Sequence, residues 1–437
     1  MTRPSAPPAA STFRRCGARP RRERGAALLV VLLVVAVLTA LAVDLAYGTR
    51  VSLQIAVNAR DELRATYQAR SAVSLARLVL HFQQQLDGAA NVSAQAMARM
   101  AGGAQPATPQ SFSFRLWEAV PVDSSVASMF LGARPREPVR KEAEPAAKPG
   151  APAPGPGDAG EAFQARIEDE ERKVNVAQLA GLSAMAGPQL QRFLLTARDP
   201  RYDVLFDRED ANGGRFSRRD VAAALKDWVD EDGTTSAVGS NPAQPFEDAF
   251  GDENLAYDRG EERYRAKNAR FDSLDELYLL SGISDAFMAA FGDQLTVYPD
   301  VNAPTNVNNA DPDQQTVNIL LMSDPPGIPQ PALLDPAFAQ KLDAALRLAR
   351  PLPFMTLSVP QFAGILQALG IRVQPVFLQA QSTDSRNPFG SRSSTFTVRA
   401  TGRAGPVEKD IEAVVAMDGR AGPLAQDLGR IIHWRED

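Results

Sequence analysis

The sequence predicts an α+β protein in which a long amino-terminal helix packs on an antiparallel β-sheet and a large α-helical domain is inserted into that sheet. Three observations predict this fold. An apolar run from Ala26 to Val43 continues without proline to Leu86. Helix-start signals fill the chain between residues 175 and 371. Segments of alternating polarity, typical of strands, lie on both sides of that helical stretch.

The apolar run is long enough to cross a membrane. Between Ala26 and Val43 no residue is charged and Thr39 is the polar one, whereas arginines crowd the chain before Gly25. A spanning helix needs about twenty apolar residues. Arginines on one side favour keeping that end in the cytoplasm, which sends the rest of the chain across the membrane. We expect Leu28, Leu32 and Leu38 to belong to this membrane anchor.

Three interpretations of this amino terminus are open. In the first, the run is the core of a secretory signal peptide that is cut near Ala40–Ala42. In the second, it is a plain uncleaved anchor. In the third, a basic leader (residues 1–25) is cut off between Gly25 and Ala26, and the run stays in the mature chain. The chain beyond Val43 favours the third interpretation, since apolar residues continue at helical spacing to an expected end at Asp87–Gly88. They are Leu63, Tyr67, Leu75, Leu78, Val79, Phe82 and Leu86. We expect this stripe to pack on the chain's own globular head.

The remaining chain divides by composition. The predicted parts are the helix at 26–88, a first β part at 89–174, an inserted helical domain at 175–371 and a second β part at 372–437. Within the first β part, residues 133–160 form a Pro/Ala-rich linker that cannot build a core. Strands are predicted from Ser111, Phe163, Lys173, Arg372, Thr395 and Asp410 and over the last residues.

Capping boxes predict helix starts in the inserted domain. In such a box a serine side chain caps the backbone and a residue three positions later reaches back. The pairs are Ser217 with Asp220, Ser273 with Glu276, and Ser358 with Gln361.

Composition excludes several classes of function. The single cysteine, Cys16, lies in the leader, so neither a disulfide nor thiol catalysis is expected in the mature chain. A net charge of −5 argues against nucleic acid as a partner. His81 and His433 are the two histidines, and we expect both to be packing or surface residues. A membrane-anchored hydrolase with paired carboxylates among Asp227, Asp230 and Asp258 is the enzyme alternative, but no catalytic motif accompanies them, so we predict no catalytic residues.

An ordered set of motifs carries a family resemblance. They are L-K-D-W-V-D-E-D-G from Leu225, G-D-E-N-L-A-Y from Gly251, Y-R-A-K-N from Tyr264, S-L-D-E-L from Ser273, L-T-V-Y-P from Leu295 and V-N at Val307. Together with the leader, they resemble the general secretion pathway protein K family, the minor pseudopilins K of type II secretion. Most pseudopilins have a glutamate at the fifth mature position, which is Val30 here, and its absence is typical of subunit K.

The resemblance implies a pilin-like fold and a non-enzymatic role. A member of this family is a single-pass protein of the inner membrane with its head in the periplasm. It caps the pseudopilus tip with minor pseudopilins I, J and H, primes assembly of major pseudopilin G, and is cut after Gly25 and methylated by a prepilin peptidase. The alternative is a minor subunit of a type IV pilus-like machine, or a membrane-anchored periplasmic scaffold.

Acidic loops in the inserted domain predict a calcium site. Carboxylates crowded on loops repel one another unless they are solvated or bridged by a hard cation. An EF-hand is excluded, because its sixth and twelfth positions are Thr235 and Asn241. A solvated acidic surface is the other interpretation. Calcium in the inserted domain of the K family favours a structural site, for which the predicted ligands are Asp230, Asp232, Glu253 and Asp258. The acid that ends the family's G-A-E-D pattern is Asn254 here, so one ligand is neutral or absent.

Overall fold

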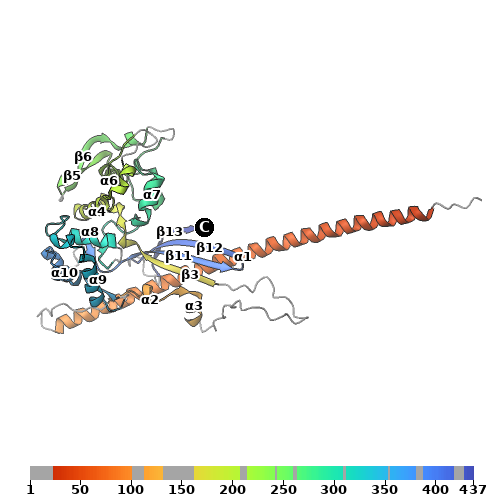
Figure 1. Ribbon diagram of the computed structural model, residues 1–437, viewed down its shortest axis with the longest axis horizontal. Coiled ribbons are helices and arrows are strands. Elements are labelled where there is room, and N and C mark those ends of the chain that lie inside the picture. The colour runs from red at the N-terminus through yellow and green to blue at the C-terminus, as the bar shows by residue number, and fades with distance from the viewer. Residues whose placement is uncertain are drawn as a thin grey trace, which may run out of the picture. The chain divides into compact units, whose positions relative to one another are not determined.

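The computed structural model describes the chain except for residues 1–22, 101–112, 131–161, 207–213, 242–243, 259–262, 309–311, 353–354, 380–386 and 418–427. Most of the predicted leader and the linker at 133–160 therefore lie outside the described residues. The chain divides into two compact units, Met1–Arg60 and Asp61–Asp437. Figure 1 labels many of the helices and strands.

Helix α1 (Glu23–Met100) runs unbroken over 78 residues. Its end differs from the prediction, because it continues through Asp87 and Gly88 instead of stopping there. One glycine costs a helix interior only about 1 kcal/mol. The alanine-rich sequence from Ala89 to Met100 has the propensity to offset that cost.

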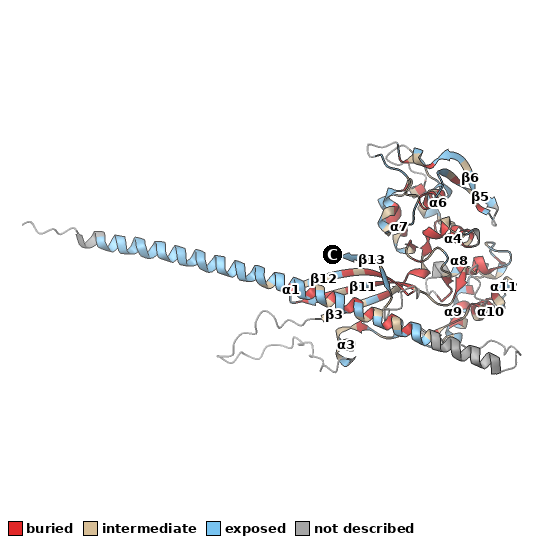
Figure 2. Ribbon diagram, turned by 180° about the vertical axis from the view of Figure 1, so that it is seen from behind, coloured by how far each residue is buried: buried red, intermediate tan, exposed pale blue. Residues whose placement is uncertain are grey.

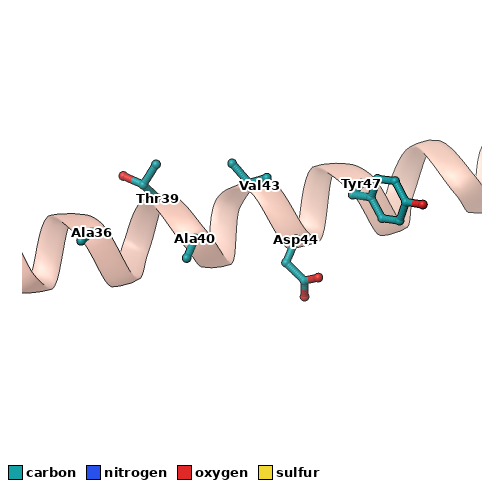
Figure 3. Close-up of a pocket in the computed structure, with 6 residues that line it drawn as sticks. All are labelled: Ala36, Thr39, Ala40, Val43, Asp44 and Tyr47. Atoms are coloured by element: carbon teal, nitrogen blue, oxygen red, sulfur yellow. The ribbon is translucent and has the colours of Figure 1, made fainter.

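In the first unit, α1 carries the apolar run. Among the described residues it is the one helix long and apolar enough to cross a membrane, since an 18-residue window of it has a mean hydropathy of 2.9. Leu28, Leu32 and Leu38 are all exposed. Figure 2 draws this stretch of α1 in pale blue, the colour of exposed residues. Figure 3 shows Ala40 and Asp44 on one side of this helix and Thr39 and Val43 on the other. Asp44 is the first charged residue after the arginines, so it marks where the lipid-compatible stretch ends.

In the second unit, five strands form one antiparallel sheet. Their order is β13-β12-β11-β3-β2. The bounds are β2 Val122–Asp123, β3 Ala162–Asp169, β11 Thr395–Ala404, β12 Val407–Ala416 and β13 Arg430–Glu436. Strands β3 and β11 pair directly, from Ala162 opposite Arg403 to Asp169 opposite Phe396. This pairing confirms that two β parts, far apart in the sequence, form one sheet.

The second-unit part of α1 packs on this sheet through alanines. Six of its buried apolar side chains share one core with the sheet residues Ile167, Val398, Ala413 and Val415. They are Ala69, Ala72, Val73, Ala76, Val79 and Leu80, and Ala65 is buried one turn earlier. The predicted packing of helix on sheet is confirmed, but most of the predicted stripe is wrong, because large apolar residues of α1 remain exposed. They are Leu63, Tyr67, Leu78, Phe82 and Leu86.

A close approach of backbones explains why alanines line this face of α1. A Cβ atom placed on Gly402 of β11 would lie 2.1 Å from the Ala65 carbonyl oxygen and 2.4 Å from the Ala69 nitrogen. Helix and strand therefore touch backbone to backbone at this point. Bulkier side chains at the contact would push α1 away from the sheet.

The inserted domain is mainly helical, as predicted, and has two hydrophobic cores. Its α-helices are α4 Ser183–Thr196, α5 Asp203–Phe206, α6 Arg218–Asp227, α7 Asp285–Phe291, α8 Pro312–Met322, α9 Phe338–Ala349, α10 Val359–Ala368 and α11 Pro375–Leu378. The first core includes Leu225, Trp228 and Phe287. The second includes Phe362 and Leu366 and extends to Phe377 and Phe389, so residues predicted as the start of the second β part pack with the helices instead.

Two of the three predicted capping boxes form. Ser217 caps α6 with Asp220, and Ser358 caps α10 with Gln361, with both reciprocal hydrogen bonds present. Ser273 makes no side-chain cap, because the segment after it is a 3₁₀-helix, η5 (Leu274–Leu279). Glu276 instead accepts hydrogen bonds from Lys267 Nζ and the Asp272 backbone nitrogen.

Two predicted strands are wrong. In the segment from Ser111, the described residues begin at Ser113 and form only the two-residue β1 (Ser113–Phe114), paired with β9 (Met355–Thr356), before helix α2 (Leu116–Ala119) begins. The segment from Arg372 contains α11, whose first residue is Pro375. Proline lacks the N–H that a ladder needs and suits the first turn of a helix. The short helix α3 (Ser124–Phe130) comes directly after β2.

The remaining short elements lie around the helices. Three two-stranded sheets pair β4 (Val174–Asn175) with β7 (Leu295–Thr296), β8 (Thr305–Asn306) with β10 (Phe389–Gly390), and β5 (Thr234–Asn241) with β6 (Gln244–Asp252). The other 3₁₀-helices are η1 Glu170–Arg172, η2 Val176–Ala180, η3 Pro200–Tyr202, η4 Glu253–Ala256, η6 Gly292–Gln294 and η7 Pro331–Leu334. The β5–β6 hairpin lies in the stretch that the sequence predicts to be acidic loops.

Three consecutive buried carboxylates lie at the end of β3, and two of them accept hydrogen bonds from the chain just before β11. Asp169 accepts a 2.6 Å hydrogen bond from Ser393 Oγ, and Glu171 accepts a 2.6 Å bond from Ser394 Oγ. Glu170 pairs with Lys173 Nζ at 2.6 Å. Burial, together with the charge of Asp169, raises the pKa of Glu171 well above its usual value. The sequence pattern predicts an ordinary strand end here and does not reveal these contacts.

Candidate metal centre

Helix α6 and the β5–β6 hairpin together position a group of acidic side chains. The capping box at Ser217 fixes the start of α6, and Asp227 is the last residue of that helix. Asp230 lies in the turn after it. The hairpin then returns the chain, so that Glu253, the first residue of η4, lies beside the end of α6.

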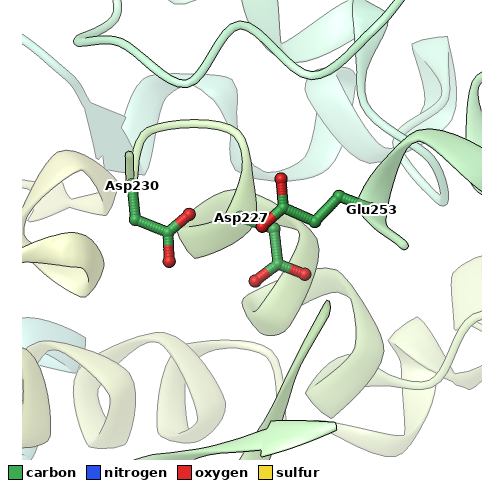
Figure 4. A group of neighbouring side chains, drawn as sticks. All are labelled: Asp227, Asp230 and Glu253. Carbon is green, nitrogen blue, oxygen red and sulfur yellow. The ribbon is translucent and has the colours of Figure 1, made fainter. Parts of the chain in front are cut away.

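Asp227, Asp230 and Glu253 form a compact group, which we call the acidic cluster. One carboxylate oxygen from each lies within 4.8 Å of the others. Figure 4 shows the Glu253 side chain reaching toward Asp227, with Asp230 entering from the turn on the other side. Asp227 and Glu253 are buried and Asp230 is half-buried.

The hydrogen bonds leave one carboxylate of the acidic cluster without partners. Both oxygens of Asp227 accept from the Ser236 backbone nitrogen at 3.1 Å. Asp230 accepts from Lys226 Nζ through Oδ2. Glu253 is 3% exposed, and neither of its oxygens has a hydrogen-bond partner among the described residues. A buried carboxylate without partners is costly, so this position calls for a positive ligand.

The electrostatics of the acidic cluster agree with this geometry. Burial raises the pKa of Glu253 to about 8, and the charges of Asp227, Asp230 and Asp232 add to the rise. Burial also raises the pKa of Asp227 and of Asp230, and hydrogen bonds from Ser236 and Lys226 oppose these shifts. Each acid makes its neighbours harder to ionise, and a bound cation would reverse that effect.

The residues present fit a hard divalent cation. Ca²⁺ binds carboxylate oxygens, mono- or bidentate, from flexible loops and turns. The acidic cluster supplies three carboxylates, and Glu253 and Asp230 have oxygens that accept no hydrogen bond from the described residues.

The structure brings together part of the ligand set predicted from the sequence. Asp230 and Glu253 belong to the acidic cluster. Asp232 is exposed, accepts a hydrogen bond from the Thr234 nitrogen at 2.8 Å, and adds to the raised pKa of Glu253. Asp258 lies apart, with its exposed carboxylate 3.6 Å from Arg263 Nε.

Asp227 is not among the four predicted ligands. A signal for it is present in the sequence, because it is the first acid in the run that ends α6, three residues before Asp230, and that spacing keeps both near one helix end. Asn254 does not join the cluster, since its Oδ1 accepts from the Ala266 nitrogen at 3.2 Å.

The predicted processing residues lie at the amino-terminal end of α1. Gly25 and Ala26 precede the stretch whose side-chain surroundings are described, so cleavage between them stays a prediction. His433 packs its ring 5.4 Å from that of Tyr298, which is consistent with the packing role predicted for it.

Comparison with solved structures finds a distant similarity. This chain is similar to a chain in the crystal structure of the GspK-GspI-GspJ complex from the type 2 secretion system of enterotoxigenic Escherichia coli, with 15% sequence identity and a TM-score of 0.38. The match covers 63% of this chain and 80% of that one. No protein-family model and no curated protein matches the chain.

Proposed function

We propose that this chain is a minor pseudopilin of type II secretion, of the K type, which caps the pseudopilus tip and primes its assembly. The observation that carries the proposal is the course of α1. The helix that contains the apolar run continues, unbroken, to the alanine face that shares a core with the sheet. A signal peptide that is cut off has no need of such continuity, whereas a retained anchor that is also a structural stalk requires it.

The proposed location and processing are those that this role requires. The apolar run anchors the chain in the inner membrane, and the head from Asp61 onward lies in the periplasm. A prepilin peptidase cuts between Gly25 and Ala26 and methylates the new amino terminus. The basic residues before the run support this orientation. A minor subunit of a type IV pilus-like machine or a periplasmic scaffold remains the alternative.

The proposed partners are minor pseudopilins I, J and H and, below them, major pseudopilin G. Exposed apolar residues on the second-unit part of α1 support contacts with other subunits. Tyr67 is 59% exposed, Leu78 37% and Phe82 46%, whereas the alanines on the opposite face of the same helix are buried. Large apolar side chains grouped on one exposed face are typical of an interaction site.

Co-purification tests this assembly. Full-length chain extracted in detergent with co-expressed minor pseudopilins I and J is expected to elute with them as one complex. Changing Leu78 and Phe82 to glutamate should reduce recovery of the complex at least about ten-fold, since desolvating two charges costs more than 1.4 kcal/mol. Leu348→Glu is the matched control, because Leu348 is 86% exposed on α9. Pseudopilins I and J that associate with each other but leave this chain behind would contradict the proposal.

We also propose that the acidic cluster binds calcium as a structural ion. Asp227, Asp230 and Glu253 would hold it, and the ion would supply positive charge that joins the end of α6 to the start of η4. The support is the buried Glu253 carboxylate, whose oxygens have no hydrogen-bond partner among the described residues. With its single cysteine at Cys16, the head has no disulfide to hold these loops.

A further inference from the structure

Lys226 already places a positive charge at the acidic cluster. It lies on α6, one residue before Asp227, and its Nζ donates to Asp230 Oδ2. The same nitrogen donates to Ser236 Oγ at 2.8 Å and lies 5.9 Å from the centroid of the Phe246 ring. Its side chain is 19% exposed. One ammonium group therefore connects α6 both to an acid of the cluster and to the two strands of the hairpin.

This ammonium group neutralises only part of the acidic cluster. It donates to Asp230 and Ser236, whereas the Glu253 oxygens stay without a hydrogen bond from any described residue. The cluster therefore holds three carboxylates against one lysine, with Asp232 close enough to add to the negative charge. A divalent cation would satisfy Glu253, but it would have to share Asp230 with Lys226.

We propose that Lys226 is an internal counter-ion that competes with the divalent cation for Asp230, so that cation binding displaces its ammonium group. This inference rests on the proposed calcium site and adds the residue that sets its affinity. In the cation-free protein, Lys226 reduces repulsion among the acids. In the cation-bound protein, the ion takes over that role and the Lys226 contact with Ser236 of β5 is released.

Cation binding would also change the attachment of the β5–β6 hairpin to α6. Ser236 is held twice, through its nitrogen by Asp227 and through its hydroxyl by Lys226. Cation binding would keep the first link and exchange the second for a direct bond between the ion and Asp230. The cation would therefore change how β5–β6 is attached to α6 without unfolding either element.

Calcium titration of matched lysine variants tests the proposal. Full-length protein in detergent is titrated by calorimetry as wild type, Lys226→Met, Lys226→Arg and Lys341→Met. Methionine keeps the apolar stem and removes the charge, while arginine keeps the charge. Lys341 pairs with Asp335 at 2.6 Å on α9, so its substitution makes the same change in net charge away from the site. Lys226→Met is expected to bind calcium about ten-fold more tightly, which corresponds to about 1.4 kcal/mol. The other two variants should stay within about two-fold of wild type.

The outcomes separate the two proposals. Equal calcium affinity in wild type and Lys226→Met would overturn the competition while leaving the calcium site in place. Absence of calcium binding in wild type and in every variant would overturn both. A second readout is the melting temperature in chelator, where Lys226→Met should melt below Lys341→Met and calcium should remove the difference. A difference that persists at saturating calcium would also overturn the exchange.

Discussion

Replacing Gly402 with alanine is expected to lower the free energy of unfolding of the head by about 3 kcal/mol, the upper end of the usual cost of overpacking. The added Cβ would meet the Ala65 carbonyl oxygen at 2.1 Å and the Ala69 nitrogen at 2.4 Å. Both are backbone atoms of α1, so no side chain can rotate away. The helix must move from the sheet and open the core that contains Ala69, Ala72 and Val398.

Urea unfolding of the Asp61–Asp437 unit measures this effect. Gly364→Ala is the matched control, because nothing lies within 4 Å of its added Cβ on α10 and alanine is the better helix former. That control should be neutral or stabilising by up to about 1 kcal/mol. If Gly402→Ala unfolds at the same urea concentration as wild type, α1 does not contact β11 backbone to backbone.

Glu253→Gln is expected to abolish most of the stabilisation by calcium. At a calcium concentration about 100 times the dissociation constant, a bound ion stabilises wild-type protein by about 2.7 kcal/mol. The substitution removes the buried carboxylate that accepts no hydrogen bond from the described residues, and with it the strongest requirement for a cation. In chelator, the same variant should be more stable than wild type, since it removes repulsion with Asp227 and Asp230.

The stability of the cation-free protein is expected to fall as the pH rises, because the pKa of Glu253 is raised. Without a cation, the pKa of Glu253 is raised from 4.5 to about 8. Its contribution to stability is therefore fully present below about pH 4.5 and is lost as the pH rises toward 8. Proton and cation compete for the same carboxylate, so calcium affinity should increase across this range. Glu253→Gln should weaken the pH dependence of stability and the pH dependence of calcium affinity.

Melting curves at several calcium concentrations and pH values check these expectations. Asp258→Asn is the control, because Asp258 is exposed and pairs with Arg263 outside the acidic cluster. It should keep the calcium response of wild type. A response lost in Asp258→Asn but kept in Glu253→Gln would favour the ligand set predicted from the sequence over the cluster in the structure.

The sequence predicts the elements of this fold better than their contacts. Strong alternation in T-F-T-V-R-A-T-G and D-I-E-A-V-V-A-M predicts β11 and β12, and Ser217 and Ser358 mark helix starts, because these signals act over a few residues. The apolar stripe of α1 predicts the wrong buried face. A helix is expected to bury its largest apolar residues. Here the backbone at Gly402 lies so close to Ala65 and Ala69 that only small residues fit at the contact.

The acidic cluster is predictable only in part, for a related reason. Asp230 and Glu253 belong to stretches rich in acidic residues, so composition identifies them as candidate ligands. Their meeting with Asp227 depends on the β5–β6 hairpin, whose sequence T-T-S-A-V-G-S-N lacks a clear alternation of apolar residues. Without that hairpin, Asp258 is an equally good candidate. Lys226 likewise becomes relevant only when Ser236 and Asp230 are both placed within reach of its ammonium group.

The first residue of the mature protein tests the central claim most directly. The chain should be purified from the membranes of cells that contain a prepilin peptidase, and its amino terminus identified by mass spectrometry. The account predicts a chain that starts at Ala26, carries an N-methyl group and retains Leu28, Leu32 and Leu38. A mature chain that starts near Val43, with the apolar run removed, would contradict it.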